Sequence, residues 1–440
     1  MYDWANSVYN LVITSTIFPA YYAAITGDNN GSTPDYVRFF GRTYESSSLY
    51  NYVLGSGFLI VAVMSPVLSS IADYKGNKKT FLRFFCTLGS LACMGLFFFK
   101  DINTLYIGII CSIIACIGFW SSLVFYNSYL PEIAPPEQRD AVSAKGFSMG
   151  YIGSVLMQLV CLVFVFKPEW FGMQDDGTMP SRVSFLLVGI WWFGFAQITL
   201  TRLPNGTPSA VRPQYNILSN GFIELKKVFA ELKTQPLLKR FLLSFFFYNM
   251  GVQTVMLVAT LFGSKELNLP TGKLIITILI IQVVAILGAW SIAKLSARLG
   301  NIKTLIGIVI IWIGICLGAY YIATLHNRGV NVELHFYVLA GIVGLVMGGI
   351  QSLSRSTYSK LMPVTKDTTS YFSFFDVTEK IAIVIGMFSF GLITEITRSM
   401  KNSVLAIIVF FVIGLLFLIY TLAKQNQLMK NTAPYEPVLS

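Results

Sequence analysis

GNKKT, at residues 76–80, returns as GNIKT at residues 300–304, at an offset of 224 residues. A second pair, YNSYLP at 126–131 and YSKLMP at 358–363, has an offset of 232 residues. Each of these segments lies at the end of an apolar run, and the two pairs keep the same order along the chain. The chain therefore reads as two parallel copies of one unit. Repeats of this kind are typical of membrane proteins built from two related bundles of helices.

Twelve apolar runs surround these motifs, each close to the roughly 20 residues that cross a hydrocarbon core as a helix. They centre on residues 4–24, 50–72, 81–99, 104–126, 146–166, 183–203, 240–262, 273–294, 304–325, 335–358, 372–393 and 403–423. We expect an all-α polytopic membrane protein with two pseudo-symmetric bundles of six transmembrane helices. The predicted units are an N-terminal bundle (1–204), a cytoplasmic linker (205–239), a C-terminal bundle (240–425) and a cytoplasmic tail (426–440).

The composition excludes an ordinary soluble domain, because 55% of the 440 residues are hydrophobic and only 12% are charged. Soluble domains carry about 25% charged residues. The six Cys all lie in apolar runs without a CxxC pair, and His326 and His335 share one short loop. No phosphate-binding loop of the Gly-x-x-x-x-Gly-Lys-Ser/Thr type occurs. We therefore expect no metal, no cofactor and no hydrolysis of ATP by this chain.

The net charge of +11 is unevenly distributed over the predicted loops. In a soluble protein it would suggest a nucleic acid partner, which we do not expect here. The loops and tail on the side of both termini hold 21 Lys and Arg, and the opposite loops hold 10. Membrane proteins keep the side with more Lys and Arg in the cytoplasm. Both termini are therefore predicted to be cytoplasmic.

The linker contains an amphipathic segment, GFIELKKVFAELK, at residues 221–233. Its apolar residues recur at spacings of three and four, and its lysines are expected on other faces of the helix. We predict a helix lying on the cytoplasmic membrane surface. The apolar residues are Phe222, Leu225, Phe229 and Leu232, and the lysines are Lys226, Lys227 and Lys233.

SSIADYKGNKK, at residues 69–79, resembles the cytoplasmic signature of the major facilitator superfamily, Gly-x-x-x-Asp-Arg-x-Gly-Arg-Lys. Asp73 and Gly76 keep their places, and Lys78 and Lys79 supply the basic charge. Gly76 permits a tight turn, and Asp73 can accept hydrogen bonds from a helix N-terminus or pair with a base in the other half. We interpret this group as a gate. The alternative is a surface turn with anchoring charges.

Longer segments resemble the vacuole-effluxer branch of this superfamily, which includes fungal vacuolar amino-acid exporters and bacterial relatives. They are YDWANSVYNLVITSTIFPAYY (2–22), FYNSYLPEIA (125–134), SAKGFSMGYIGS (143–154), GGIQSLSRSTYSKLMP (348–363) and FFDVTEKIAIVIG (374–386). The resemblance implies secondary transport by a bacterial-type member, in the bacterial inner membrane and as a monomer. It leaves the substrate open. One departure is Met250, which stands where the family commonly has Asp.

Polar side chains gather in the spans that line the central cavity of this superfamily. Those in spans one, seven and ten are spaced three or four residues apart, so each set shares a helix face. The candidate substrate-binding residues are Asn6, Asn10, Tyr126, Asn127, Asn249, Gln253, Gln351 and Arg355. The alternative is that these residues only hold the helices together. Arg355 is the natural partner for a carboxylate, from the protein or from a substrate.

Ionisable groups at membrane depth are costly, and they are most often functional. Span eleven carries Asp376, Glu379 and Lys380, with Glu379 roughly 14 Å along the helix from its start and so close to mid-bilayer. We predict that Glu379 or Asp376 carries a coupling proton and pairs alternately with Lys380 or Arg355, and we add Asp3 to this group. The alternative is a local Asp376–Lys380 pair, which leaves Glu379 unexplained.

These observations favour a proton-coupled secondary transporter, not an enzyme, that moves an amino acid or related metabolite by alternating access. The expected partners are a small-molecule substrate, the lipid bilayer and protons. A multidrug exporter of the same fold would need a broader and more apolar cavity. A membrane-embedded enzyme would need a catalytic group at depth, and a receptor would need a larger soluble part.

Overall fold

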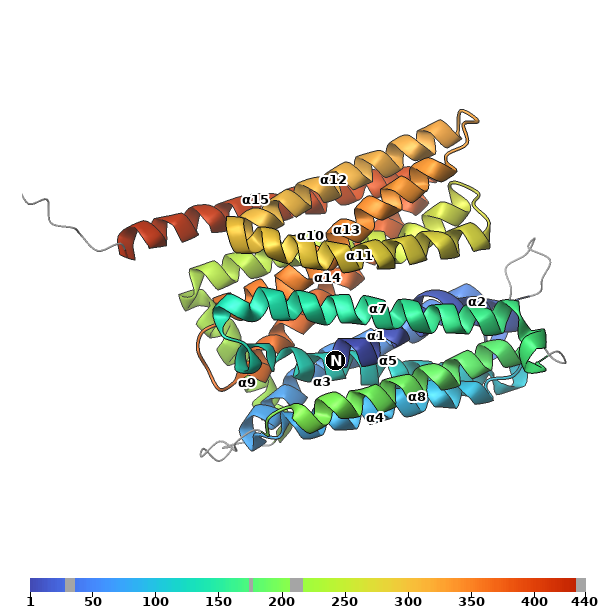
Figure 1. Cartoon of the computed structure of the whole chain (residues 1–440), viewed down its shortest axis with the longest axis horizontal. Coiled ribbons are helices and arrows are strands. Elements are labelled where there is room, and N and C mark those ends of the chain that lie inside the picture. Colours follow the sequence, from blue (N-terminus) through green and yellow to red (C-terminus); the bar gives the residue numbers. More distant parts are fainter. Residues whose placement is uncertain (28–35, 174–176, 206–216, 433–440) are drawn as a thin grey trace, which may run out of the picture.

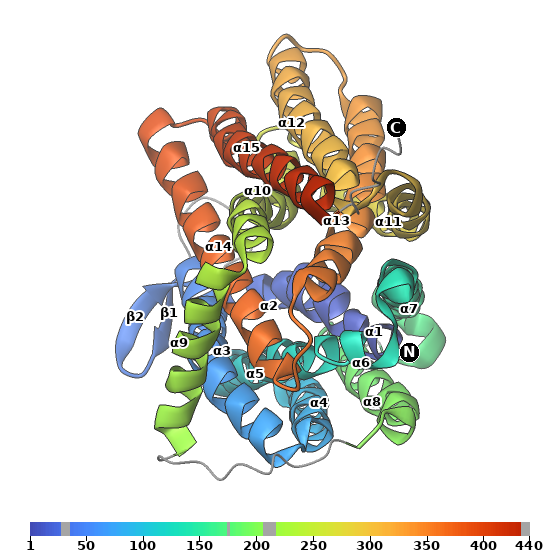
Figure 2. The same ribbon diagram turned by 90° about the vertical axis from the view of Figure 1, so that its left-hand side faces the viewer.

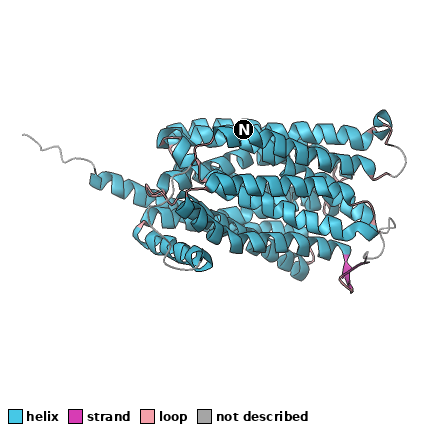
Figure 3. Cartoon of the chain, turned by 90° about the horizontal axis from the view of Figure 1, so that it is seen from below, coloured by secondary structure: helices cyan, strands magenta, loops and turns pink. Residues whose placement is uncertain are grey.

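Helices account for almost all of this computed structural model, which describes residues 1–27, 36–173, 177–205 and 217–432. Within these residues, 12 helical segments are long and apolar enough to cross a membrane. This confirms the predicted all-α polytopic fold. One small β-hairpin, β1 (Tyr36–Phe39) and β2 (Arg42–Glu45), was not expected from the sequence and lies at one end of the bundle (Figure 3).

The first half of the chain forms six of these segments. The first is composite, because α1 (Tyr2–Val8) continues through the π-helical segment η1 (Tyr9–Thr16) into α2 (Ile17–Thr26). The others are α3 (Ser46–Lys75), α4 (Lys78–Gly95), α5 (Leu105–Asn127), α7 (Arg139–Phe166) and α8 (Met179–Arg202). A short helix, α6 (Leu130–Ile133), lies between α5 and α7.

The second half repeats this arrangement with α10 (Pro236–Lys265), α11 (Thr271–Leu299), α12 (Asn301–His326), α13 (Glu333–Leu361), α14 (Thr368–Thr397) and α15 (Met400–Thr432). In Figure 1 most of these yellow-green to red helices form one layer, and the blue to green helices of the first half form the other; α14 extends from the first layer toward the second (Figure 2). The buried apolar side chains largely follow the same division into two cores. The halves meet where α3 packs on α14 and where α7 packs on α11 and α13.

Helix ends extend beyond the predicted apolar runs. The helix α10 begins at Pro236, before residue 240 where the second bundle is predicted to begin, and α15 runs to Thr432, past the predicted start of the tail at residue 426. Hydropathy marks only the part of a helix that needs lipid, so polar turns at its ends are missed. Pro at the first position of α10 suits a helix start, because the N–H that it lacks would have no partner there.

The linker forms α9 (Ile217–Thr234), which lies lengthwise across the end of the bundle over α3 and α14 (Figure 2). Phe222 and Phe229 are exposed, as an amphipathic surface helix requires. The side chains of Leu225 and Leu232 lie outside the described residues. The expectation that Lys226 and Lys233 occupy other faces is wrong. Steps of four, three and four residues place them on one stripe with the two phenylalanines.

Candidate functional site

A cavity of about 240 Å³ lies between the two halves, at the middle of the helices. Side chains from α1, η1, α3, α5 and α7 line one side, and side chains from α10, α11, α13 and α14 line the other. Most of the predicted substrate-binding residues are among them: Asn6, Asn10, Asn127, Asn249, Gln253, Gln351 and Arg355. The helix spacing noted in the sequence therefore does bring these amides to one space. Tyr126 lies behind this lining and contacts Asp3.

Arg355 is buried beside the cavity, and groups of the first half occupy its guanidinium. Its Nη1 lies 3.7 Å from Oδ1 of Asp3 and donates to Asn127 Oδ1 at 3.0 Å. Its Nε and Nη2 donate to the hydroxyl and carbonyl oxygens of Ser143 at 3.0 and 3.1 Å. Tyr126 donates its hydroxyl to Asp3 at 2.5 Å. In this conformation Arg355 therefore joins the two halves, and the carboxylate that it faces is Asp3.

A second charged cluster lies on α14. Lys380 is 1% exposed, and its Nζ lies 2.7 Å from Oδ1 of Asp376 and 3.8 Å from Oε2 of Glu379. Glu379 lines the cavity and accepts a hydrogen bond of 2.9 Å from Gln253. The ammonium of Lys380 also lies 3.7 Å from the centre of the Trp120 ring. The cluster holds two carboxyl groups around one ammonium group, with Asp376 and Lys380 buried and Glu379 facing the cavity.

Two amides that line the cavity have an unsatisfied nitrogen. Asn6 is 1% exposed and Asn249 is 5% exposed, and neither Nδ2 atom has a hydrogen-bond partner among the described residues. An unpaired buried polar group costs about 1–3 kcal/mol. The two side chains come from α1 and α10, which are the first helices of the two halves. They remain available to a ligand that reorients them, whereas Arg355 already donates three hydrogen bonds to the first half.

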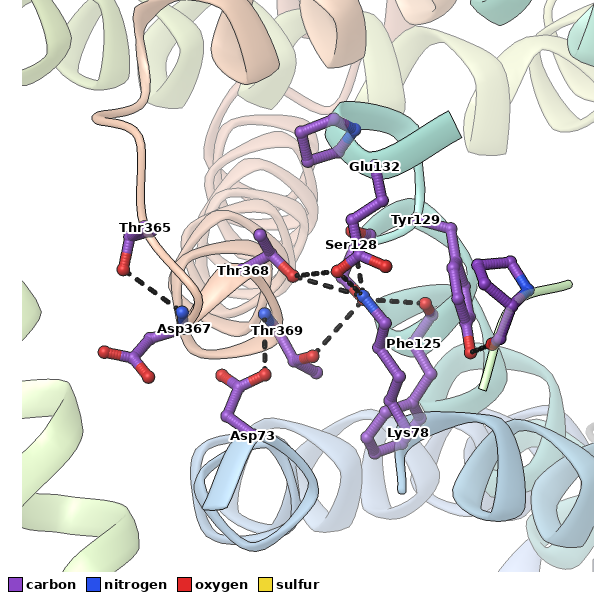
Figure 4. Close-up of polar contacts among 12 residues, drawn as sticks. Asp73, Lys78, Phe125, Ser128, Tyr129, Glu132, Thr365, Asp367, Thr368 and Thr369 are labelled. Atoms are coloured by element: carbon purple, nitrogen blue, oxygen red, sulfur yellow. Dashed lines mark hydrogen bonds and ion pairs between the residues drawn. The ribbon is translucent and has the colours of Figure 1, made fainter. Parts of the chain in front are cut away.

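The bundle is closed at the end that carries α9, which we call the α9 end. Asp73, in the last turn of α3, accepts a hydrogen bond of 3.2 Å from the backbone N–H of Thr369 (Figure 4). It accepts another of 2.8 Å from the backbone N–H of Ser370. A carboxylate is favourable there because the helix α14 begins at Thr368 and exposes its positive end. Gly76 adopts φ 59°, the left-handed turn that ends α3 and starts the chain toward α4.

Lys78 extends the same contact between the halves. Its ammonium pairs with Glu132 and donates to the hydroxyl of Thr368 at 3.3 Å (Figure 4). Lys79 differs, because it donates to the carbonyl of Leu203 at 2.8 Å and so stays within the first half. Of the predicted gate, Asp73 and Lys78 thus contact the other half, and Gly76 forms the turn between them. Lys79 does not take part in this contact.

The repeat of the motif produces a second closing contact that the sequence analysis missed. Asp140, at the start of α7, pairs with Lys360 of α13 at 2.5 Å and accepts from Asn301 at 2.8 Å. Asn301 belongs to the repeated GNIKT segment. The sequence did offer a sign of this contact. Asp140 is an acidic residue at the border of a span, and the second motif copy supplies Asn301 and Lys303, an amide and a base that could partner it.

Other functional candidates were also missed. Nothing in the sequence marked Trp120 or Ser143 as functional, because an aromatic residue or a serine is common in an apolar span. Their importance comes from the cation that each one faces. Ser7, Thr14, Ser15 and Gln282 also line the cavity.

The residues 1–430 match the family described as "Vacuole effluxer Atg22 like". The chain belongs to this family. That result confirms the resemblance found in the sequence motifs. Among Atg22-like relatives, the uncharacterized MFS-type transporter YxiO of Bacillus subtilis (strain 168) is 30% identical over 420 residues, covering 96% of this chain and 93% of the relative. Autophagy-related protein 22 of Saccharomyces cerevisiae (strain ATCC 204508 / S288c) is 26% identical over 404 residues, covering 82% and 75%.

Solved structures show which fold the Atg22-like chain adopts. The fucose:proton symporter FucP in its outward conformation aligns with a TM-score of 0.67 at 11% identity, over 96% of both chains. The proton:xylose symporter XylE aligns with a TM-score of 0.67 at 12% identity, over 96% of this chain and 93% of XylE. This confirms the major facilitator fold. Together with the family match and the similarity to YxiO, this makes the chain an integral membrane transporter of the major facilitator type, which implies a small-molecule substrate.

Proposed function

We propose that this chain is a proton-coupled secondary transporter of a small zwitterionic or anionic solute, with amino acids as the first candidates. The observation that carries this proposal is the cavity between the halves, where charged groups meet amides from both halves. Asp3 and Arg355 stand at one part of its wall and Glu379 at another. Such a lining can bind a solute that has both hydrogen-bonding and charged groups.

The size of the cavity favours a small metabolite over a drug. At about 240 Å³ it is smaller than the roughly 300–1,000 Å³ typical of sites for drug-sized ligands. Several aromatic side chains, including Phe58, Phe147 and Phe245, line it as well. An apolar side chain on the substrate would pack against these rings. We therefore expect small amino acids with apolar side chains to be better substrates than large cationic drugs, the class that a multidrug exporter would take.

Protonation and substrate binding would be coupled through the same charged groups. If Asp3 took up a proton, its pairing with Arg355 would weaken, and the guanidinium would become available to a substrate carboxylate. Asn6 and Asn249, which lack an acceptor, would complete the site from both halves. In the second cluster, protonation of Glu379 would leave Lys380 paired with Asp376 alone. The first step links protonation to the contact between the halves, because Asp3 and Arg355 belong to opposite halves.

Alternating access would require the contacts between the two halves at the α9 end to break. Asp73, Lys78 and Asp140 hold that end closed, and their contacts would separate for the cavity to open there. We assign the α9 end to the cytoplasm, because the loops of that side carry most of the Lys and Arg. The protein would act as a monomer in a bacterial inner membrane, with each bundle moving as a unit.

The test begins with the purified protein in detergent and a panel of amino acids, small organic anions and cationic drugs. A true substrate should raise the midpoint of thermal unfolding, because it binds only the folded state. The hits are then offered to proteoliposomes with and without a pH gradient. Gradient-dependent uptake of an amino acid supports the proposal. Stabilisation and uptake of cationic drugs alone would identify a multidrug exporter, and chemical conversion of a hit would identify an enzyme.

A further inference from the structure

The surface helix α9 has one exposed stripe that combines aromatic and basic side chains. Phe222, Lys226, Phe229 and Lys233 follow each other at steps of four, three and four residues, which places them within a narrow sector of the helix. Phe222 is 54% exposed and Phe229 is 55% exposed, and both lysines are exposed. Among the residues that the structure describes, none pairs with either lysine.

The opposite face of α9 is bound to the transporter. Val228 is 1% exposed, and Lys227 pairs with Asp367 at 3.3 Å in the loop before α14. Glu231 accepts a hydrogen bond from the hydroxyl of Tyr371 in the first turn of α14. Since α9 also packs on α3, it contacts both halves across the closed end (Figure 2). The helix is thus fixed to the protein by one face, and the aromatic and basic stripe points away from these contacts.

The surroundings of α9 suggest what covers this stripe. The helix lies across the end of a bundle of candidate membrane spans, the level at which a bilayer would present its headgroups (Figure 2). Two exposed phenylalanine rings are costly in water but favourable at the boundary between headgroups and acyl chains. Lys226, which lies between the two rings, and Lys233, one turn beyond Phe229, would face the phosphates. Apolar and basic residues on one stripe match a surface that offers hydrocarbon and negative charge together.

We propose that the Phe222–Lys226–Phe229–Lys233 stripe docks on an acidic bilayer surface, with the lysines bound to lipid phosphates. Because the other face of α9 holds α3 and α14, the docked lipid stabilises the closed α9 end. This lipid site lies outside the substrate cavity and depends neither on the substrate nor on proton coupling.

The experiment titrates short-chain phosphatidylglycerol into the purified full chain in a neutral detergent and follows the midpoint of thermal unfolding. The Lys226→Gln/Lys233→Gln variant is expected to need about 30-fold more lipid for the half-maximal shift. This follows from about 1 kcal/mol for each lysine near an acidic surface and tenfold in affinity for every 1.4 kcal/mol. The matched control is Lys100→Gln/Lys265→Gln, which removes two exposed lysines at the opposite end of the bundle and should behave like the unmodified chain.

Further titrations distinguish an acidic lipid from other compounds as the cause of the shift in the unfolding midpoint. Phosphatidylcholine of the same chain length should give a much smaller shift, and glycerol 3-phosphate alone should give none. A second variant, Phe222→Ser, tests the apolar part of the stripe. It keeps both lysine charges and should weaken lipid binding severalfold. Equal lipid requirements in the stripe and control variants would overturn the proposal. So would a full shift with glycerol 3-phosphate, which would mark a site for a soluble anion.

Discussion

Arg355 is a buried cation whose main partners come from the other half of the molecule. Removing one member of a buried ion pair leaves the other charged and unpaired, at a cost of about 3–5 kcal/mol. We therefore expect Arg355→Ala to lower the free energy of unfolding by about this amount, since Asp3 would lose its cation. Unfolding in detergent, followed by the fluorescence of tryptophan, measures this change.

The double variant Asp3→Asn/Arg355→Ala, compared with Asp3→Asn and Arg355→Ala alone, serves as the control for this pair. It removes both charges, so it should be more stable than the sum of the two single variants predicts, by about 0.5–3 kcal/mol. Strict additivity would mean that the two charges do not interact. If the double variant regains stability but not transport, the Asp3–Arg355 pair is needed for transport beyond its contribution to stability.

Glu379 is the carboxyl group of the α14 cluster that lines the cavity. Glu379→Gln keeps an oxygen that accepts the hydrogen bond from Gln253 but removes the titrating group. We expect uptake by proteoliposomes to lose most of its dependence on the pH gradient, while binding of the substrate persists. Glu395→Gln, an exposed site on the same helix, should leave the pH dependence intact. Unchanged pH dependence in the Glu379 variant would remove this residue from proton coupling.

At the level of helices, the close packing of α1 on α7 depends on glycine. A Cβ atom at Gly153 would lie 2.7 Å from the backbone oxygen of Trp4, which cannot move without shifting α1. Because overpacking costs about 1–3 kcal/mol, we expect Gly153→Ala to destabilise the protein by that amount. Gly194→Ala, on α8, is the matched control, since nothing lies within 4 Å of its added Cβ. Equal unfolding midpoints of the two variants would show that α1 and α7 are more loosely packed than described.

The molecule as a whole must open and close at the α9 end if it works by alternating access. The hydroxyl oxygens of Ser128 and Thr369, from opposite halves, lie 3.3 Å apart there. We expect Ser128→Cys/Thr369→Cys to form a disulfide on oxidation, because side chains this close suit its geometry. The cross-linked protein should stop transporting in proteoliposomes and recover after reduction. Each single cysteine variant should transport under both conditions. Full transport by the cross-linked form would show that this seam does not open.

Local patterns of the sequence predicted much of this structure. Runs of apolar residues marked the spans, because each helix must satisfy its own backbone in lipid. The spacing of four residues placed Asp376 and Lys380 on one face, and they form the 2.7 Å pair that this spacing allows. Gly76 marked a turn because its left-handed backbone suits glycine. These features depend on neighbours within about one helical turn.

Contacts between distant helices depended on how the two halves pack. The pairing of Arg355 with Asp3, of Asp140 with Lys360 and of Lys380 with the ring of Trp120 joins segments hundreds of residues apart or on different bundles. No period in the sequence selects one of these partners, because several basic and acidic groups of equal chemistry were available to each. The sequence established the spans, the repeat and the polar helix faces from local hydropathy and helical geometry. The folded arrangement selected the charge partners, since a buried charge pairs with whatever group the packing of both bundles brings within reach.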